Sequence, residues 1–390
     1  MRRQKLFLVP FFLLFFLAAM AFTSYGTETD PGSVVTGIGA GLEDFNIEEI
    51  QKFINAQSGQ TGWNLSFSEL AGDLMSGNLK TVMGKMGTAV KDYLFKELNS
   101  STLLMGQVIA LGIIGAVFSN FSGIFTSSQI SETGFFVTYL LLFTCLAASF
   151  FSSIQIAGQA VSQVLQFMQV LMPSFFLAAA FAGGSVSSVA VYEFTLWAIT
   201  MAQWLLMDVM VPFVRVYILL VLAGHVTKED ILSKLTDLIK SVIDWSLKTL
   251  VGVVLGFHMI QGMVLPYVDS MKSATVQKLI GIIPGLGQGA GAITQIVMGS
   301  GVLIKNSIGA AGVVVLLIMM IVPVLKLVVM MFLYQGVAAI LQPICDKRIV
   351  SCISKTGQGH KMLLNIVLSS ALLFIITIAV VCSWKSFTAG

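Results

Sequence analysis

Long apolar runs recur from residue 102 to the C-terminal region, and they limit how this polypeptide can fold more than any other feature. Several runs reach about 20 residues, the length a helix needs to cross the roughly 30 Å hydrocarbon layer of a membrane. Overall, 56% of the residues are hydrophobic and 11% are charged, whereas a soluble domain carries about 25% charged residues. The sequence therefore predicts an all-α, polytopic membrane protein.

Residues 101–390 are predicted to form a transmembrane domain of about seven to eight helices. The seventh run is too long for one straight crossing and contains Pro323 and Lys326, so a kink or a split into two helices is expected there. The expected spans are residues 102–122, 134–157, 163–182, 188–207, 209–224, 243–263, 307–342 and 362–384.

The N-terminus has the pattern of a secretory signal peptide over residues 1–21. Basic residues come first, an apolar stretch follows, and the small residues Ala19 and Ala21 predict cleavage after Ala21. An uncleaved membrane anchor is the alternative, because the apolar stretch is long for a signal peptide. In both cases residues 22–100 are expected on the extracytoplasmic side, and residues 27–100 hold ten acidic and five basic residues.

Three amphipathic helices are expected in this outer segment. Asn46 with Glu49, and Ser66 with Glu69, have the spacing of a capping box, which marks a helix start. Residues 79–98 place apolar side chains on one face at helical period, so this helix should lie on the membrane surface or on a neighbouring subunit and lead into the first span.

Two loops, 225–242 and 345–361, are expected in the cytoplasm. The second contains Asp346, Lys347 and Arg348 and is rich in lysine, as the excess of positive charge on cytoplasmic loops predicts. In the first loop, Thr227 and Asp230 should start an amphipathic helix in the plane of the lipid headgroups, and a partner-docking helix is the alternative.

No pattern typical of an active site occurs, and the chain is not expected to be an enzyme. His225, His258 and His360 lack metal-ligand spacing, so His258 is expected to hydrogen-bond to a neighbouring helix. The sequence contains no phosphate-binding loop and no clustered basic face for nucleic acid, and no cofactor or metal is predicted. The four cysteines should be free thiols, since a bond between Cys345 and Cys352 would require an oxidising compartment.

Glycine is concentrated in residues 281–309. We expect a packed hairpin that lines a pore, because irregular backbone at membrane depth must be buried in protein or face water. An ordinary external loop is the alternative. A similar spacing at Gly252 and Gly256 would permit close helix contact. The residues assigned to this segment are Gly281, Pro284, Gly285, Gly287, Gly289, Gly291 and Lys305.

Isolated charges lie within or beside the apolar runs. Such groups cost several kcal/mol in lipid, so Glu193 is expected to pair with Arg215 or Lys326. Asp208 is expected in a turn before Pro212. A proton or ion relay is the alternative, but a relay needs such residues in series, and structural pairing is therefore favoured.

Two motifs resemble the stage III sporulation protein AE family. They are G-S-G-V-L-I-K-N-S-I-G at residues 299–309 and Q-P-I-C-D-K-R-I at residues 342–349, and the order of signal peptide, outer segment and multi-span body also agrees. The resemblance implies a spore-forming, Gram-positive bacterium and the mother-cell membrane around the engulfed forespore. It names no catalytic residue.

The resemblance also implies partners and a function. Members of the family work with other membrane proteins of the same operon, a forespore-side partner and a separate ATPase. The assembly is similar to specialised secretion systems and acts as a channel, or feeding tube, that keeps the forespore able to transcribe. The leading interpretation is a non-enzymatic subunit that associates with itself or with these partners. A stand-alone small-solute permease and an intramembrane enzyme are the alternatives.

Overall fold

The chain forms helices and no strands in the part that the structure describes, which confirms the predicted all-α fold. A computed structural model describes residues 47–61, 66–75, 79–120, 128–182, 185–226, 232–280 and 287–383. The helices are α3 (Ile47–Thr61), α4 (Phe67–Met75), α5 (Leu79–Asn120), α6 (Ser128–Phe181), α7 (Ser185–Gln203), the π-helix η3 (Trp204–Met210), α8 (Val211–Gly224), α9 (Ser233–Ile280), α10 (Gly287–Leu341) and α11 (Lys347–Ser383).

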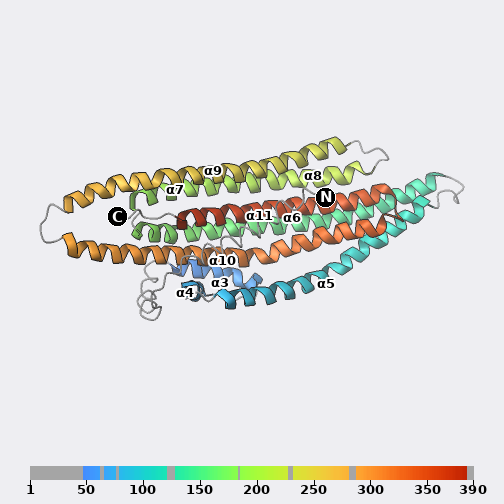
Figure 1. The fold of residues 1–390 in the computed structure, drawn as a ribbon. Helices are drawn as coiled ribbons and strands as arrows, with labels where there is room; N and C mark the ends of the chain where they lie inside the picture. Colours follow the sequence, from blue (N-terminus) through green and yellow to red (C-terminus); the bar gives the residue numbers. More distant parts are fainter. Residues whose placement is uncertain are drawn as a thin grey trace.

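The long helices lie side by side in one elongated bundle (Figure 1). In this view α9 forms one edge, and α7 with α8 lies next to it. Helices α6 and α11 occupy the middle, and α10 and α5 follow on the opposite side. Helices α5, α8 and α10 end, and α6, α9 and α11 begin, at the same end of the bundle. The two loops predicted to be cytoplasmic are therefore attached at one end.

Helix α11 is the centre of the bundle. It packs against α6, α8, α9 and α10. In its most apolar stretch 78% of the residues are buried, compared with 33–44% in the other long apolar helices. The remaining helices therefore surround α11, and their outward faces form most of the surface.

Five helices in the described part of the chain are long and apolar enough to cross a membrane. They are Tyr93–Ser119, Glu132–Ala180, Tyr192–Gly224, Gly301–Leu341 and Lys347–Cys382. Helix α6 alone has 54 residues, which corresponds to about 80 Å at 1.5 Å per residue. This length is more than twice the thickness of a hydrocarbon layer, which is roughly 30 Å. A single straight crossing therefore places only part of α6 within the hydrocarbon layer.

The boundaries between the expected spans differ from those in the structure. The second and third expected spans lie in one uninterrupted helix, α6, and the fourth and fifth are joined through η3. The backbone stays helical across both expected boundaries. Gln155 and Gln159 lie on the exposed face of α6, and Asp208 lies within η3. Helix α10 likewise continues past Pro323. The number of membrane crossings remains a prediction.

The outer helices are as expected at α4. The backbone N–H of Glu69 donates to Ser66 Oγ at 3.3 Å, which is the helix cap that the spacing predicts. Phe53 of α3 contacts Phe167 of α6, with 5.9 Å between ring centroids, so α3 packs on the bundle. The third expected helix is the first part of the 42-residue α5. Residues 1–46, including Asn46 and the signal region with Ala21, lie outside the described residues.

The helix expected in the headgroup plane has a different position. Its described part, from Ser233, forms the beginning of α9 and continues in line with the sixth expected span. Lys240 Nζ donates to Gln358 Oε1 of α11 at 3.1 Å, so this part of α9 runs along the bundle. Because this segment forms one continuous helix with the sixth expected span and runs beside α11, it is not a separate helix lying across the bundle in the headgroup plane.

Glycine allows α6 and α11 to approach closely at Gly359. A Cβ atom at this position would lie 2.6 Å from Cε2 of Phe150, which is fully buried and cannot move aside. We expect Gly359→Ala to lower stability by about 1–3 kcal/mol through overpacking. Gly336→Ala is the matched control, because a Cβ there meets nothing within 4 Å. The check is the apparent Tm of both variants in the same detergent, and equal values would contradict the proposed contact.

Candidate functional site

Each of the three histidines joins α11 to a different helix. His225, directly after α8, contacts Ser351 Oγ at 2.9 Å, and His258 of α9 contacts Thr377 Oγ1 at 3.0 Å. His360 belongs to α11 itself and contacts Ser153 of α6. The hydrogen bond of His258 to a neighbouring helix confirms the prediction, and residues far apart in sequence meet along one helix.

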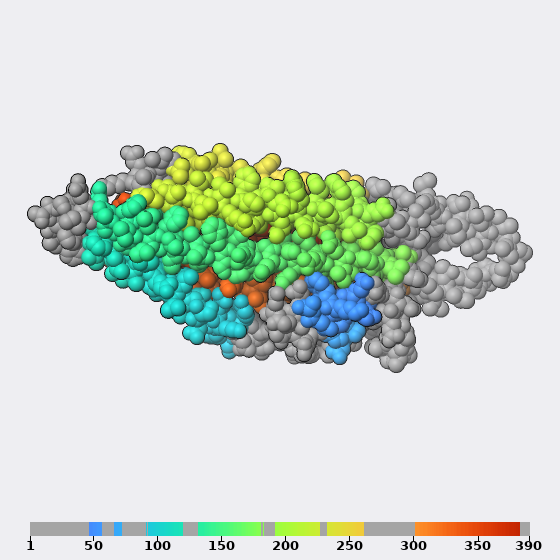
Figure 2. All heavy atoms as spheres, turned by 180° about the vertical axis from the view of Figure 1, so that it is seen from behind, coloured from blue at the N-terminus to red at the C-terminus, as the bar shows by residue number. Residues whose placement is uncertain are grey.

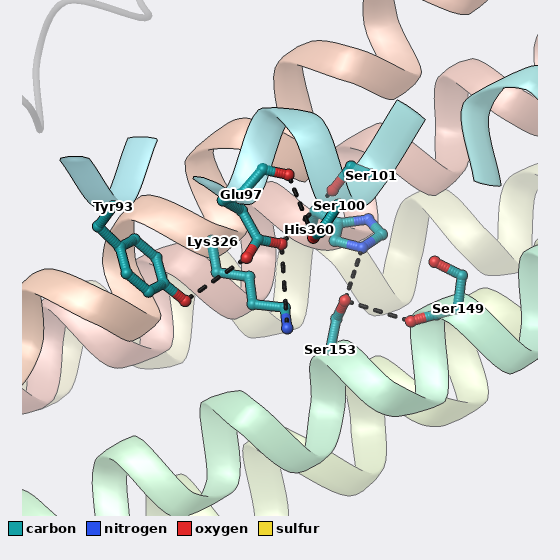
Figure 3. Close-up of polar contacts among 8 residues, drawn as sticks. All are labelled: Tyr93, Glu97, Ser100, Ser101, Ser149, Ser153, Lys326 and His360. Carbon is teal, nitrogen blue, oxygen red and sulfur yellow. Dashed lines mark hydrogen bonds and ion pairs between the residues drawn. The ribbon is translucent and has the colours of Figure 1, made fainter. Parts of the chain in front are cut away.

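A buried polar cluster surrounds His360 (Figure 3). Its Nδ1–H donates to the Thr356 carbonyl at 2.9 Å, and its Nε2 lies 3.0 Å from Ser153 Oγ. The Ser153 hydroxyl also lies 3.2 Å from the Ser149 carbonyl. Tyr334 of α10 donates to Ser149 Oγ at 2.7 Å. These contacts link α6, α10 and α11 at one level. Hydrogen bonds between polar side chains of neighbouring helices are typical of membrane helix packing.

Figure 3 also shows the ion pair of Glu97 and Lys326. Lys326 Nζ is 3.9 Å from Glu97 Oε1. Tyr93 and Ser101 donate to the same carboxylate at 3.5 and 3.4 Å. The predicted pairing of Lys326 with Glu193 is therefore wrong. Glu193 is exposed on α7, whereas Glu97 is buried where α5 packs against α10.

Arg215 and Asp208 line a shallow groove between α6 and the η3–α8 segment. Gln155 and Gln159 of α6 form the opposite wall. The groove holds both charges and two glutamines among apolar residues such as Ile154 and Val211. A π-helical segment such as η3 is frequent at functional sites. Asp208 is therefore part of a helix, and the predicted turn before Pro212 is wrong.

The Gly-rich segment lies where α9 is followed by α10. Gly287, Gly289 and Gly291 belong to the first turns of α10, so the chain is already helical there. The expected irregular hairpin can extend only over residues 281–286, which lie outside the described residues together with Gly281, Pro284 and Gly285. Its predicted role in lining a pore stays untested.

The first family motif instead packs into the bundle. Lys305 is only 2% exposed. A Cβ at Gly309 would overlap Cys382 of α11, so this glycine permits close helix contact. Gly252 and Gly256 do not have this role, because a Cβ at either meets nothing within 4 Å.

The second family motif forms a clasp at the turn between α10 and α11. The backbone N–H of Arg348 donates to Asp346 Oδ1 at 2.8 Å, which caps the start of α11. The Arg348 side chain donates to both carboxylate oxygens at 3.2 and 3.3 Å and lies over the Phe135 ring, with Cζ 3.8 Å from its centroid. Ser119 of α5 donates to Asp346 Oδ2 at 3.3 Å. The clasp therefore joins α5, α6 and α11.

Cysteine contributes to the same turn. Cys345 Sγ donates to the Gly112 carbonyl of α5 at 3.2 Å, and Cys352 is buried in α11. All four cysteines are free, as predicted. Lys347, between Asp346 and Arg348, is exposed and takes no part in the clasp.

Helix α11 also has one partly exposed stripe, and the first half of this stripe is polar. The polar residues in this first half are Ser351, Ser354, Lys355, Gln358, Lys361 and Asn365. On one side, α9 presents Asp237, Lys240, Asp244 and Lys248 at helical spacing. On the other, Gln335 of α10 donates to the Ser354 carbonyl at 3.1 Å. We call the six α11 residues and the four α9 residues the polar face.

Sequence reasoning did not identify the polar face or Glu97. Lys355 and Lys361 were assigned to a cytoplasmic loop, and Glu97 was assigned to the outer segment. One signal was available, because Ser354, Gln358, Lys361 and Asn365 recur every three or four residues, as one face of a helix would. Only the tertiary structure shows that the charged residues of α9 lie beside this face of α11.

The ion pair can be tested with a double-mutant cycle. Lys326→Met leaves the buried Glu97 carboxylate without its cation, so we expect a strong loss of stability, on the order of 3 kcal/mol. In Glu97→Gln the amide retains polar contacts. The double variant should lose less unfolding free energy than the sum of the losses in the two single variants, and the difference should be about 1–2 kcal/mol. Additive losses of unfolding free energy in detergent would show that the two side chains do not interact.

The clasp predicts a pH-dependent contribution to stability. Burial alone would raise the pKa of Asp346, but the hydrogen bonds and charge of Arg348 and the hydroxyl of Ser119 lower it below 3.8. The ionised carboxylate is thus favoured in the folded state, and its contribution is complete above about pH 4 and lost as the pH falls further.

We therefore expect Asp346→Asn to lower stability at pH 7 by about 1–2 kcal/mol. The difference from the unchanged protein should shrink below about pH 4. The measurement is the apparent Tm of both proteins across this pH range. A difference that does not change with pH would contradict the role of the charge.

Comparison with known proteins agrees with the two motifs. The sequence profile described as Stage III sporulation protein AE (spore_III_AE) matches residues 65–384. A relative in Bacillus subtilis (strain 168), the Stage III sporulation protein AE, is 24% identical over 301 residues, which cover 77% of this chain and 75% of that protein. No solved structure matches. Because the profile covers most of the sequence, the chain belongs to the stage III sporulation protein AE family.

Proposed function

We propose that this protein is a membrane-embedded, non-enzymatic subunit of a multiprotein channel between mother cell and forespore. In this proposal it lies in the mother-cell membrane around the forespore, with residues 22–100 on the extracytoplasmic side. Its partners are other membrane proteins of the same operon, a forespore-side protein and a separate ATPase. The channel supports late gene expression in the forespore.

One observation supports this proposal most directly. A bundle of apolar helices, in a family named for sporulation, carries charged and amide side chains along a partly exposed face of its central helix. Charged groups within a membrane protein are costly and commonly face water or a transport pathway.

The proposal can be tested in the natural spore-forming host. Deletion of the gene should leave engulfment complete and reduce a late forespore reporter strongly, and the unchanged gene should restore it. The double variant Ser354→Leu with Gln358→Leu makes the polar face more apolar and should not restore it. Gln166→Leu, on the exposed face of α6, is the matched control and should restore it fully.

Normal forespore expression in the deletion strain would remove the sporulation role. Full restoration by the double variant, inserted at the same level as the control, would remove the polar face from the function. Solute uptake by the purified protein alone would favour the permease, and loss of function with Glu193→Ala, at a side chain exposed on α7, would favour an intramembrane enzyme.

A further inference from the structure

We propose that the polar face borders water at bilayer depth and attracts small anions, while the outward faces of α5, α6 and α8 contact lipid. This inference names the conducting surface and the preferred charge of the solute, and it rests on the channel function proposed above. The argument requires two points. The polar face must lie at the depth of the hydrocarbon, and its charge must be positive.

The depth follows from exposed apolar side chains on the helices around α11. Ile113 and Val117 of α5, Val137 and Leu141 of α6, Val216 of α8 and Phe332 of α10 are all at least 44% exposed. Gly115 of α5 lies beside Thr138 of α6, which places the first two pairs at one level. Exposed apolar groups on several helices at one level are typical of a lipid-facing belt. Figure 2 shows the side of the molecule where α5, α6 and α8 form the surface.

The polar stripe of α11 begins at this level, where Ile349 lies beside Gly115, and it continues along the bundle to the level of Phe332 and Phe151. Gln335, which bonds to the Ser354 carbonyl, is one helical turn from the exposed Phe332. Gly359, one residue after Gln358, packs against Phe150 of α6, which precedes the exposed Phe151. At the depth of Ser354 and Gln358, therefore, the bundle exposes the apolar side chains of Phe151 on α6 and Phe332 on α10, and it is polar between α9 and α10.

Helix α9 continues the polar surface. Lys240 donates to Gln358 at 3.1 Å, which directs the charged side of α9 toward the stripe. The exposed apolar residues Leu235, Leu238 and Trp245 lie on another side of the same helix. Lipid can cover that apolar side, but a charged group in hydrocarbon costs several kcal/mol. Water is the occupant that solvates the charged side without this cost.

The charge of the polar face is positive. Among its described residues are four lysines, Lys240, Lys248, Lys355 and Lys361, and two aspartates, Asp237 and Asp244. A concave or narrow aqueous surface with an excess of charge of one sign raises the local concentration of ions of the opposite sign. Rings of lysine or arginine likewise select anions in pores. We therefore infer a preference for small anionic solutes.

Cysteine reactivity tests both points on the full chain in lipid vesicles, without partner proteins. The four native cysteines are replaced, and single cysteines are introduced as Ser354→Cys and Asn365→Cys on the polar face. Ala148→Cys and Phe151→Cys of α6, which flank Phe150 at the level of Gly359, are the matched controls on the lipid side. Two water-soluble methanethiosulfonates of similar size, one with a sulfonate and one with a trimethylammonium group, report access and local charge.

We expect both polar-face cysteines to react and both α6 cysteines to be protected. The rate constant of each reagent is divided by its rate constant with a free thiol in solution. After this normalisation, the anionic reagent should react with the polar-face cysteines roughly five- to tenfold faster than the cationic one. Lys361→Gln should reduce this ratio, and so should high salt.

Protection of the polar-face cysteines to the level of the α6 controls would overturn the proposal, and so would equal rates for the two reagents or a faster cationic reagent. Because the vesicle experiment does not involve sporulation, its failure is distinct from failure of the proposed function. Loss of the reporter in the deletion strain together with protected cysteines would leave a channel subunit whose conduit lies elsewhere.

Discussion

Hydrogen bonds from three histidines to polar side chains on other helices fix α11 at the centre of the bundle. Each links α11 to a different neighbour: His225 beside α8, His258 on α9 and His360, whose partner lies on α6. Each bond contributes only about 1 kcal/mol in a membrane protein. Their main effect is on the helix register, because a slip of any helix by one turn would leave a buried polar group without its partner. The register of these four helices therefore follows from these contacts.

This central position gives α11 two kinds of environment. Most of its surface is enclosed by apolar side chains, and Gly359 and Gly309 permit the contacts with Phe150 and Cys382. The remaining stripe is not covered by a neighbouring helix to the same extent, and there the residues are polar through Asn365. The Asp346–Arg348 clasp then holds the start of α11 on α5 and α6. One helix thus combines the core of the bundle with a polar, partly exposed stripe.

Several sequence-based expectations failed for one common reason. The expected spans end on either side of polar residues such as Gln159 and Asp208, which lie between the apolar runs. A helix can carry such residues on its exposed face or in a groove without any break in its backbone hydrogen bonds. The partner of Lys326 was missed because Glu97 belongs to a segment that was assigned to the outside. Charge pairing depends on which helices become neighbours, and composition does not contain that information.

The sequence by itself determined that the protein is helical, apolar enough for a membrane and a member of its family, because these properties follow from the length of apolar runs and from contiguous motifs. It also predicted the Ser66 cap and the hydrogen bond of His258, which depend on local spacing and on the need to satisfy a buried imidazole. Only the tertiary structure decided that α6 is one rod, that Glu97 holds Lys326 and that residues of α9 and α11 form one polar face. The last two features join positions more than one hundred residues apart, and packing alone selects which of the many polar side chains meet.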